Sequence, residues 1–500
     1  MRELVRPVSI VNSGSHDEAR ERQRRATRHL LLARACLFVC VYVLSAILAR
    51  KLGASDYGVY GVIISQLLWL ELLANAGVSG ATCKLIADGR HDPAEVESSA
   101  RVLLLGSSVL LIGVCWCLAP ALANLMRIPN GAVLLRIAII DLPFAVVYAL
   151  YEGILYGYRK FGTVALVQVI YGIAKVGGVV ALIGLGFSIQ GVLVANVIST
   201  GAVCAVLSVR YPPTRFRSRC RIAAEISSIA APMALYLISA QVLLNLDLWS
   251  FKILWTGAGE VVGQYVASVN LARILTVIPA VQAGVLFASV AWAVASQEAV
   301  DARLHIQEAI RFALVMGGGA CAVLSVEASE VLSMLFSSAY AEGHRYLPLQ
   351  LAGFSLFALL DVFSNSLLAA GRRWVVGSVL VATIPLVWLS NYLLIPWVGP
   401  VGAATSLLIG MATATGVTGA MVYRHFGPVV RSSTILRVLV AMAAVGLMGA
   451  AIPGREPLVL VKHVLLGGFY LLVLYVSGEI TGKDFGLPVR ESPGRLPDAF

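Results

Sequence analysis

Long apolar runs separated by short polar stretches set the pattern of this chain. The runs recur from Leu30 to Ser477, and each is long enough to cross the roughly 30 Å hydrocarbon core of a bilayer as a helix. About fourteen such runs predict an all-α polytopic membrane protein. The expected spans are 30–49, 57–83, 100–122, 132–156, 162–184, 189–209, 229–254, 260–290, 309–336, 346–370, 375–396, 399–423, 433–452 and 457–478.

The hydrophobic pattern repeats between the two halves of the chain. Residues 149–161 and 362–374 lie 213 positions apart, and both lead from an apolar helix through a short basic turn into a second apolar helix. Gly191 and Gly402, which open the sixth and the twelfth expected helix, extend the match. Because transporters are commonly built from such repeats, the duplication predicts two pseudo-symmetric six-helix lobes followed by two further C-terminal helices.

The repeat also sets the expected domain boundaries. The two lobes are expected to run in the same direction, because each contains an even number of spans. The segments are a cytoplasmic N-terminal tail (1–28), an N-lobe with helices 1–6 (29–224), a C-lobe with helices 7–12 (225–430), helices 13 and 14 (431–478) and a cytoplasmic C-terminal tail (479–500).

Composition and charge agree with a membrane protein. Hydrophobic residues make up 59% of the chain and charged residues only 13%, whereas soluble domains have about one quarter charged residues. The expected inner segments carry 27 Lys and Arg residues and the outer segments seven. This asymmetry predicts a multi-pass protein of the inner (cytoplasmic) membrane with both termini in the cytoplasm. The net charge of +11 therefore reflects topology and anionic lipid headgroups rather than a nucleic-acid surface.

The sequence predicts no catalytic, metal or cofactor site. The eight cysteines are scattered, and the seven histidines fall in tails, loops or helix ends. The chain contains no P-loop, no His-Glu-x-x-His and no nucleophile elbow. We therefore expect a transporter rather than an enzyme, driven by a proton or sodium gradient, by the membrane potential or by downhill flow of its substrate.

Charged residues deep inside expected spans are the main functional candidates, because each costs about 2.5–3.5 kcal/mol to insert without a partner or a wet cavity. Lys175 and Arg273 lie farthest from either interface. Two interpretations remain open for them. They bind an anionic group in a central cavity, or they form salt bridges within their lobes. In the second case Lys175 pairs with Glu71, and Arg273 pairs with Asp361.

Further candidates flank these two cations. Arg34 and Arg136 lie about one turn inside their spans, where they bind substrate or reach the headgroups. Asn75 shares a helix face with Glu71, and Asn270 shares one with Arg273, because residues three or four apart are neighbours on a helix. These four residues complete the predicted substrate-binding set.

Three acidic residues are candidates for ion coupling. Glu71 and Asp361 each provide one carboxylate near the middle of a span, one in each expected lobe. Asp247 stands in an unusually polar helix, where it binds a coupling ion or serves as a structural hydrogen-bond partner.

Residues 48–61 read LARKLGASDYGVYG. This segment and several others resemble the polysaccharide transporter family of the multidrug/oligosaccharidyl-lipid/polysaccharide exporter superfamily. The resemblance covers roughly residues 30–425. The other matching segments are 75–78, 84–87, 150–161 and 329–336 leading to Tyr340.

The resemblance implies two six-helix lobes around a cavity, and a flippase that moves polyprenyl-pyrophosphate-linked oligosaccharide across the membrane for surface polysaccharide biosynthesis. Its expected partners are the lipid-linked oligosaccharide, membrane lipids, a polysaccharide polymerase and other assembly proteins. Two rivals stay open. A multidrug/cation antiporter of the same superfamily would need an acidic lobe cavity. A membrane glycosyl polymerase or ligase would need a larger external loop than this sequence offers.

Overall fold

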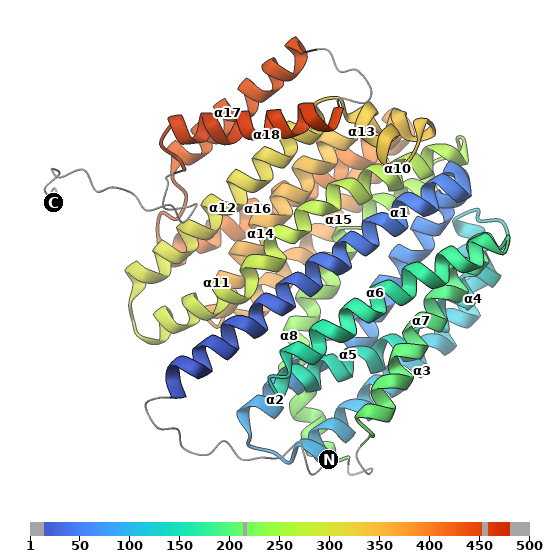
Figure 1. The fold of residues 1–500 in the computed structure, drawn as a ribbon, viewed down its shortest axis with the longest axis vertical. Coiled ribbons are helices and arrows are strands. Elements are labelled where there is room, and N and C mark those ends of the chain that lie inside the picture. The colour runs from blue at the N-terminus through green and yellow to red at the C-terminus, as the bar shows by residue number, and fades with distance from the viewer. Residues whose placement is uncertain (1–14, 214–217, 453–458, 481–500) are drawn as a thin grey trace, which may run out of the picture. The chain divides into compact units, whose positions relative to one another are not determined.

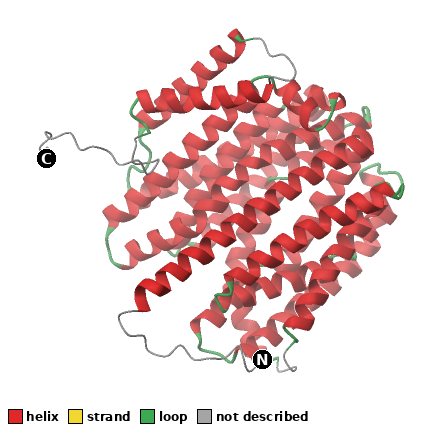
Figure 2. Cartoon of the chain, viewed as in Figure 1, coloured by secondary structure: helices red, strands yellow, loops and turns green. Residues whose placement is uncertain are grey.

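The computed structural model describes residues 15–213, 218–452 and 459–480, with side chains from residue 32 onward apart from that of residue 299. In these ranges the chain forms helices joined by short loops, with no β-strand (Figure 2). The all-α prediction is confirmed. Most of the two predicted cytoplasmic tails, 1–14 and 481–500, lies outside the described residues.

Helices follow one another along the described residues (Figure 1). They are α1 (Ser15–Asn75), α2 (Val78–Asp88), α3 (Pro93–Leu125), α4 (Gly131–Ile139), α5 (Leu142–Gly157), α6 (Phe161–Gly184), α7 (Ile189–Arg210), α8 (Cys220–Leu243), α9 (Leu246–Leu254), α10 (Gly259–Ala272), η1 (Arg273–Thr276), α11 (Val277–Ala295), α12 (Ala299–Ser325), α13 (Ala328–Leu335), η2 (Ser338–Arg345), α14 (Leu347–Ala369), α15 (Arg373–Val398), α16 (Pro400–Phe426), α17 (Ser432–Ala451) and α18 (Val459–Val476).

Thirteen of the described helical segments are long and apolar enough to cross a membrane. The difference from the expected fourteen arises at the first two spans, which one segment, Leu32–Asp88, contains. We expected an outer loop at 50–56. The chain stays helical there and bends at Gly53, whose φ of 76° lies in the left-handed region that glycine adopts without steric cost.

The described residues cluster into two compact units. Unit 1 comprises Met1–Leu271, Leu332–Gln350 and Gly371–Ala414, and unit 2 comprises Ala272–Val331, Leu351–Ala370 and Thr415–Phe500. In unit 1, α1 runs beside α6 (Figure 1). In unit 2, α17 and α18 pack on α12 around a core that includes Val445, Leu466 and Leu474. The predicted lobe boundary near residue 224 stays a prediction.

Three membrane-spanning segments are interrupted in their interior. The interruptions lie at Ala76–Gly77, at Ile140–Asp141 and at the 3-10 turn that Arg273 begins. Polar side chains stand at all three. Asp141 directly precedes the N-terminus of α5, and Arg273 follows the C-terminus of α10, so each charge opposes the partial charge at that helix end.

The second half of α1 and α10 approach each other closely in unit 1. A Cβ added at Gly263 would overlap the carbonyl oxygen of Ala54, and one at Gly58 would lie 2.7 Å from the backbone nitrogen of Gly263. Small residues let helix backbones approach in this way within membranes. This contact leaves no room for a larger residue at either glycine.

We therefore expect Gly263→Ala to lower the free energy of unfolding by roughly 1–3 kcal/mol, as overpacking does. The matched control is Gly106→Ala on α3, where an added Cβ meets nothing within 4 Å. Thermal unfolding of both variants in detergent checks this expectation. Equal unfolding temperatures for the two variants would contradict the close α1–α10 contact.

Candidate functional site

A cavity of about 380 Å³ lies within unit 1. Its walls come from both halves of α1, from α5 and α6, and from α7. The lining is mostly apolar, with polar side chains spread around it. These polar residues are Glu71, Asn75, Asp141, Tyr148, Tyr171, Lys175 and Thr200.

Three charged side chains share this cavity. Lys175 comes from α6, Glu71 from α1, and Asp141 from the interruption between α4 and α5. Both carboxylates act electrostatically on the Lys175 ammonium. The cavity thus holds two carboxylates and one ammonium, so the internal counter-charges of Lys175 are already in place.

Lys175 is positioned by an aromatic neighbour on its own helix. Its Nζ lies 3.5 Å from the hydroxyl oxygen of Tyr171 and 5.6 Å from the centroid of that ring. Tyr171 in turn stacks on Tyr148 of α5, with 5.4 Å between the ring centroids. This cation–π contact holds the ammonium at the cavity wall, and the ammonium forms no direct salt bridge with a carboxylate of the described residues.

The helix interruption fixes Asp141. Nδ2 of Asn196, on α7, donates a hydrogen bond of 2.6 Å to Oδ2 of Asp141. Oδ1 is buried, and the Thr200 hydroxyl on the same cavity wall, which donates to the carbonyl oxygen of Asn196 at 3.0 Å, also acts on the Asp141 carboxyl group. Asn196 and Thr200 of α7 therefore hold this carboxyl group at the cavity wall.

A further carboxylate lies next to the cavity on α5. Glu152 Oε1 accepts hydrogen bonds from Gln168 Nε2 at 2.9 Å and from the Tyr148 hydroxyl at 3.2 Å. The charge of Arg34 on α1 also acts on Glu152. Arg34 therefore has an internal carboxylate to interact with, as Lys175 has.

Two more of the predicted binding residues lie in unit 1. Asn75 lines the cavity, and its Oδ1 accepts hydrogen bonds from the backbone nitrogen of Ser79 at 3.1 Å and from the Ser79 hydroxyl at 2.9 Å. Arg136 on α4 does not line the cavity, and its guanidinium carbon lies 5.3 Å from the centroid of the Trp116 ring. Asn75 thus shares a site with Lys175, and Arg136 does not.

Asn270 belongs to a different polar cluster of unit 1. Its Nδ2 donates to the Tyr57 hydroxyl at 2.8 Å, and the Tyr57 and Ser45 hydroxyl oxygens lie 2.5 Å apart. This cluster joins α10 to both halves of α1. The contacts describe a structural role for Asn270, and a role in substrate binding stays a prediction.

Asp247 is buried in the first turn of α9 in unit 1. The Tyr265 hydroxyl donates a hydrogen bond of 2.5 Å to Oδ2 of Asp247. This contact is the kind of structural hydrogen bond that we expected as the alternative to ion coupling. Binding of a coupling ion at Asp247 stays a prediction.

Arg273 and Asp361 both belong to unit 2, in η1 and α14. Oδ2 of Asp361 accepts a hydrogen bond of 2.8 Å from Nδ2 of Asn365, one turn further along α14. The predicted pairing of Arg273 with Asp361 and their functional roles stay predictions. Within the described residues, no three His, Cys, Asp or Glu side chains gather in a way that could hold a metal ion.

Asp141 and Glu152 are not among the residues predicted from the sequence. Asp141 lies deep inside the expected span 132–156, and Pro143 follows two residues later. An acidic residue just before a proline is a signal for the start of a helix, so this pair could have revealed both the interruption and the carboxylate. Glu152 lies inside the repeated segment 149–161, in which only the repeat and its basic turn were interpreted.

Residues 29–287, just over half of the chain, match the family described as Polysaccharide biosynthesis protein. The chain belongs to this family. The resemblance deduced from the segments around α1 and α2 is confirmed. No curated protein matches the sequence at a significant level.

Solved transporters share the fold of this family member. The lipid II flippase MurJ, in an inward closed conformation, matches with a TM-score of 0.69 and 15% identity over 91% of this chain and 99% of that chain. An inward-facing multidrug resistance MATE family transporter of the MOP superfamily matches with a TM-score of 0.67 and 16% identity over 79% and 94%.

A MOP superfamily transporter from Pyrococcus furiosus Vc1 matches with a TM-score of 0.58 and 17% identity over 81% of this chain and 96% of that chain. At these identities the likeness establishes the fold alone. The chain is a multi-pass membrane protein with a MOP-superfamily transporter fold.

The shared cavity predicts energetic coupling between Lys175 and Glu71. Lys175→Met leaves two carboxylates in the cavity without their cation, so we expect a lower unfolding temperature. Adding Glu71→Gln removes one of these charges and should restore part of the loss, with an interaction energy of roughly 0.5–3 kcal/mol. Thermal unfolding of the two single variants and the double variant provides the double-mutant cycle. If the changes in stability of the single variants simply add up in the double variant, the coupling is contradicted.

Proposed function

We propose that this protein is a flippase that moves a polyprenyl-pyrophosphate-linked oligosaccharide across the cytoplasmic membrane for surface polysaccharide biosynthesis. Membership of the polysaccharide biosynthesis family and the MOP-superfamily fold support this proposal. The observation that carries it is the Lys175 ammonium on the wall of the unit 1 cavity. An ammonium offers three donors to phosphate oxygens, and the apolar lining around it suits a headgroup that enters from a lipid phase.

Counter-ion exchange at Lys175 is the proposed chemical step of binding. Without substrate, Glu71 and Asp141 are the acidic groups in the cavity that act electrostatically on the Lys175 ammonium. When a pyrophosphate approaches, it competes with these carboxylates, and their negative charge then favours uptake of a proton or a cation. Glu71 is thus both an ion-coupling candidate and a competitor of the pyrophosphate for Lys175. Asp141 has the same two roles.

The other predicted residues fit around this step. Asn75 lines the same cavity and contributes to headgroup binding, whereas Arg34 on α1 acts near the inner entrance and Arg136 toward the outer exit. Arg273 supplies a second cation, and Asp247 and Asp361 remain coupling candidates. The protein works by alternating access, with both termini in the cytoplasm. It acts alongside a polysaccharide polymerase and other assembly proteins.

One observation favours a second candidate function, a multidrug/cation antiporter of the same superfamily. Glu71 and Asp141 give the unit 1 cavity an excess of carboxylates over the single Lys175 ammonium. A cavity of that charge also suits an organic cation. The two functions differ in the sign of the transported group, and therefore in what a change at Lys175 does.

The flippase proposal predicts that Lys175→Gln reduces surface polysaccharide roughly ten-fold or more, because a hydrogen bond to a charged group contributes about 1.5–3 kcal/mol. Lys175→Arg keeps the positive charge and should retain part of the activity. Lys84→Gln on α2 is the matched control, since Lys84 is exposed and lies outside the cavity. The measurement is surface polysaccharide in cells that produce each variant at equal levels.

Unchanged polysaccharide in Lys175→Gln cells would overturn the assignment of Lys175. If the same variant instead increased resistance to an organic cation, the antiporter function would be favoured. Removal of the ammonium leaves a purely acidic cavity, so a cation transporter is expected to keep or gain activity.

A further inference from the structure

A second, smaller cavity lies within unit 2, between α12 and the segment that leads into α17. Its volume is about 120 Å³. The polar residues of its lining are Gln307, Glu308, Arg311, Arg431 and Thr434. Two arginines and one glutamate give the wall an excess of positive charge.

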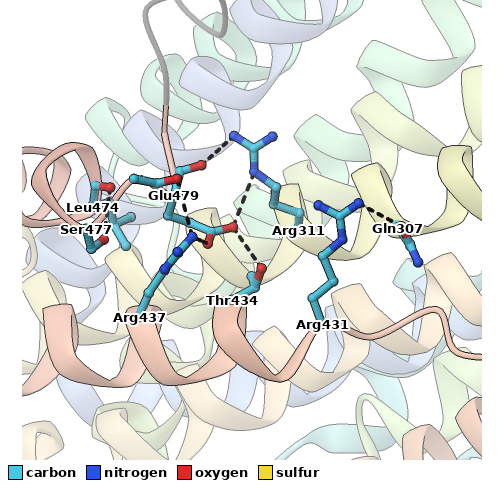
Figure 3. A network of polar contacts seen from close by, with 9 residues as sticks. Gln307, Arg311, Arg431, Thr434, Arg437, Leu474, Ser477 and Glu479 are labelled. Carbon is cyan, nitrogen blue, oxygen red and sulfur yellow. Dashed lines mark hydrogen bonds and ion pairs between the residues drawn. The ribbon is translucent and has the colours of Figure 1, made fainter. Parts of the chain in front are cut away.

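Arg311 is held at this wall by Glu479, which lies three residues beyond the end of α18. Its Nε lies 3.4 Å from Oε1 of Glu479, and its Nη2 donates a hydrogen bond of 2.7 Å to the carbonyl oxygen of Glu479 (Figure 3). Thr434 and Arg437 of α17 also bind this side chain, at 2.8 Å through Oε1 and 3.0 Å through Oε2. Both Glu479 oxygens are therefore engaged, and Arg311 is fixed in place.

Arg431 is arranged differently. Its Nη2 donates to Oε1 of Gln307 at 3.2 Å, and this is its one hydrogen bond within the described residues (Figure 3). The residue is exposed, so most of its guanidinium donors face the cavity or the surroundings. Nearby, Arg303 Nε donates to the carbonyl of Phe426 at 2.7 Å, which adds another cation beside the same loop. Arg431 thus has free donors next to a fixed partner arginine.

The cavity lies where a membrane surface is expected. The segments 303–311 and 424–437 belong to the predicted cytoplasmic side, where anionic lipids attract Lys and Arg. Leu304 of the lining is 45% exposed, and Leu436 and Leu439 of α17 are 64% and 56% exposed. Leu304 shares the lining with the two arginines, and the exposed leucines of α17 offer further apolar surface that suits an acyl chain.

We propose that this cavity binds the headgroup of an anionic phospholipid of the cytoplasmic leaflet that carries hydroxyl groups, such as phosphatidylglycerol. Arg431 binds the phosphate oxygens, because its guanidinium offers two parallel donors to them, and the positive charge of Arg311 on the same wall attracts the phosphate. Glu308 accepts a hydrogen bond from a headgroup hydroxyl. This assignment is independent of the transported substrate, since the cavity belongs to unit 2 and Lys175 to unit 1.

Such a lipid would connect two helices. It would bind α12 through Arg311 and the start of α17 through Arg431, beside the Glu479 contacts that already join α17 and α18 to α12. An anionic lipid would therefore stabilise unit 2 where these helices meet. A zwitterionic lipid lacks the net charge to do so.

Native mass spectrometry of the purified full-length protein tests the proposal. The probes are phosphatidylglycerol, phosphatidylcholine and inorganic phosphate, each added at the same concentration. We expect phosphatidylglycerol to be retained in preference to phosphatidylcholine. Arg431→Gln should lower phosphatidylglycerol retention about five-fold, the factor that corresponds to about 1 kcal/mol for one cation at a membrane surface.

Two variants serve as controls. Arg424→Gln removes an exposed cation of α16 that lies outside the cavity, and it should leave retention unchanged. Glu308→Gln removes the negative charge from the wall but keeps a hydrogen-bond acceptor, and it should leave retention equal or raise it. Thermal unfolding without added lipid shows whether each variant is folded.

Three results would overturn the assignment. Equal retention of the two phospholipids by the parent protein would do so without any variant. If Arg431→Gln and Arg424→Gln lowered phosphatidylglycerol retention equally, retention would depend on general surface charge and not on this cavity. Displacement of the lipid by millimolar inorganic phosphate would assign the cavity to a free anion instead of a lipid headgroup.

Discussion

A helix that is interrupted inside a bilayer exposes backbone N–H and C=O groups that no water is available to satisfy, so side chains or a wet cavity must do this. In this chain a side chain satisfies a backbone N–H group at the interruption next to Asn75. The Asn75 side chain caps the start of α2, and Asp141 precedes α5 beside the cavity. The same constraint that places polar groups within the membrane therefore gathers them around one space.

Those polar groups then determine the charge of the cavity. Lys175 is costly to bury alone, and Glu71 and Asp141 offset this cost because they lie on the same walls. The resulting cavity is neither simply cationic nor simply acidic. An anionic headgroup has to compete with internal carboxylates for Lys175, so binding and uptake of a positive charge become linked. This linkage is how the proposed flippase would use a gradient.

Much of the fold could be predicted from the sequence, because apolar runs of bilayer length have few alternatives to a membrane helix. The spans expected at 162–184 and 189–209 agree with α6 and α7 within a few residues. The interruptions were not predicted, since a single polar residue in a long apolar run hardly changes the average hydrophobicity. Only local signals, such as Asp141 before Pro143, mark them.

The site was predicted only in part for a related reason. Lys175 and Glu71 were recognised by their depth in the membrane, and their pairing was one of two open interpretations. Asp141 was overlooked although it lies in the same cavity. Which helices become neighbours depends on packing between surfaces that all look apolar in the sequence, so the contribution of α7 through Asn196 and Thr200 could not be foreseen.

The most direct test of the central claim is transport by the purified protein in proteoliposomes. A labelled polyprenyl-pyrophosphate oligosaccharide is placed in one leaflet, and its appearance in the other is followed beside uptake of an organic cation. The account predicts protein-dependent movement of the lipid-linked oligosaccharide and little movement of the cation. Cation transport without any movement of the oligosaccharide would contradict it.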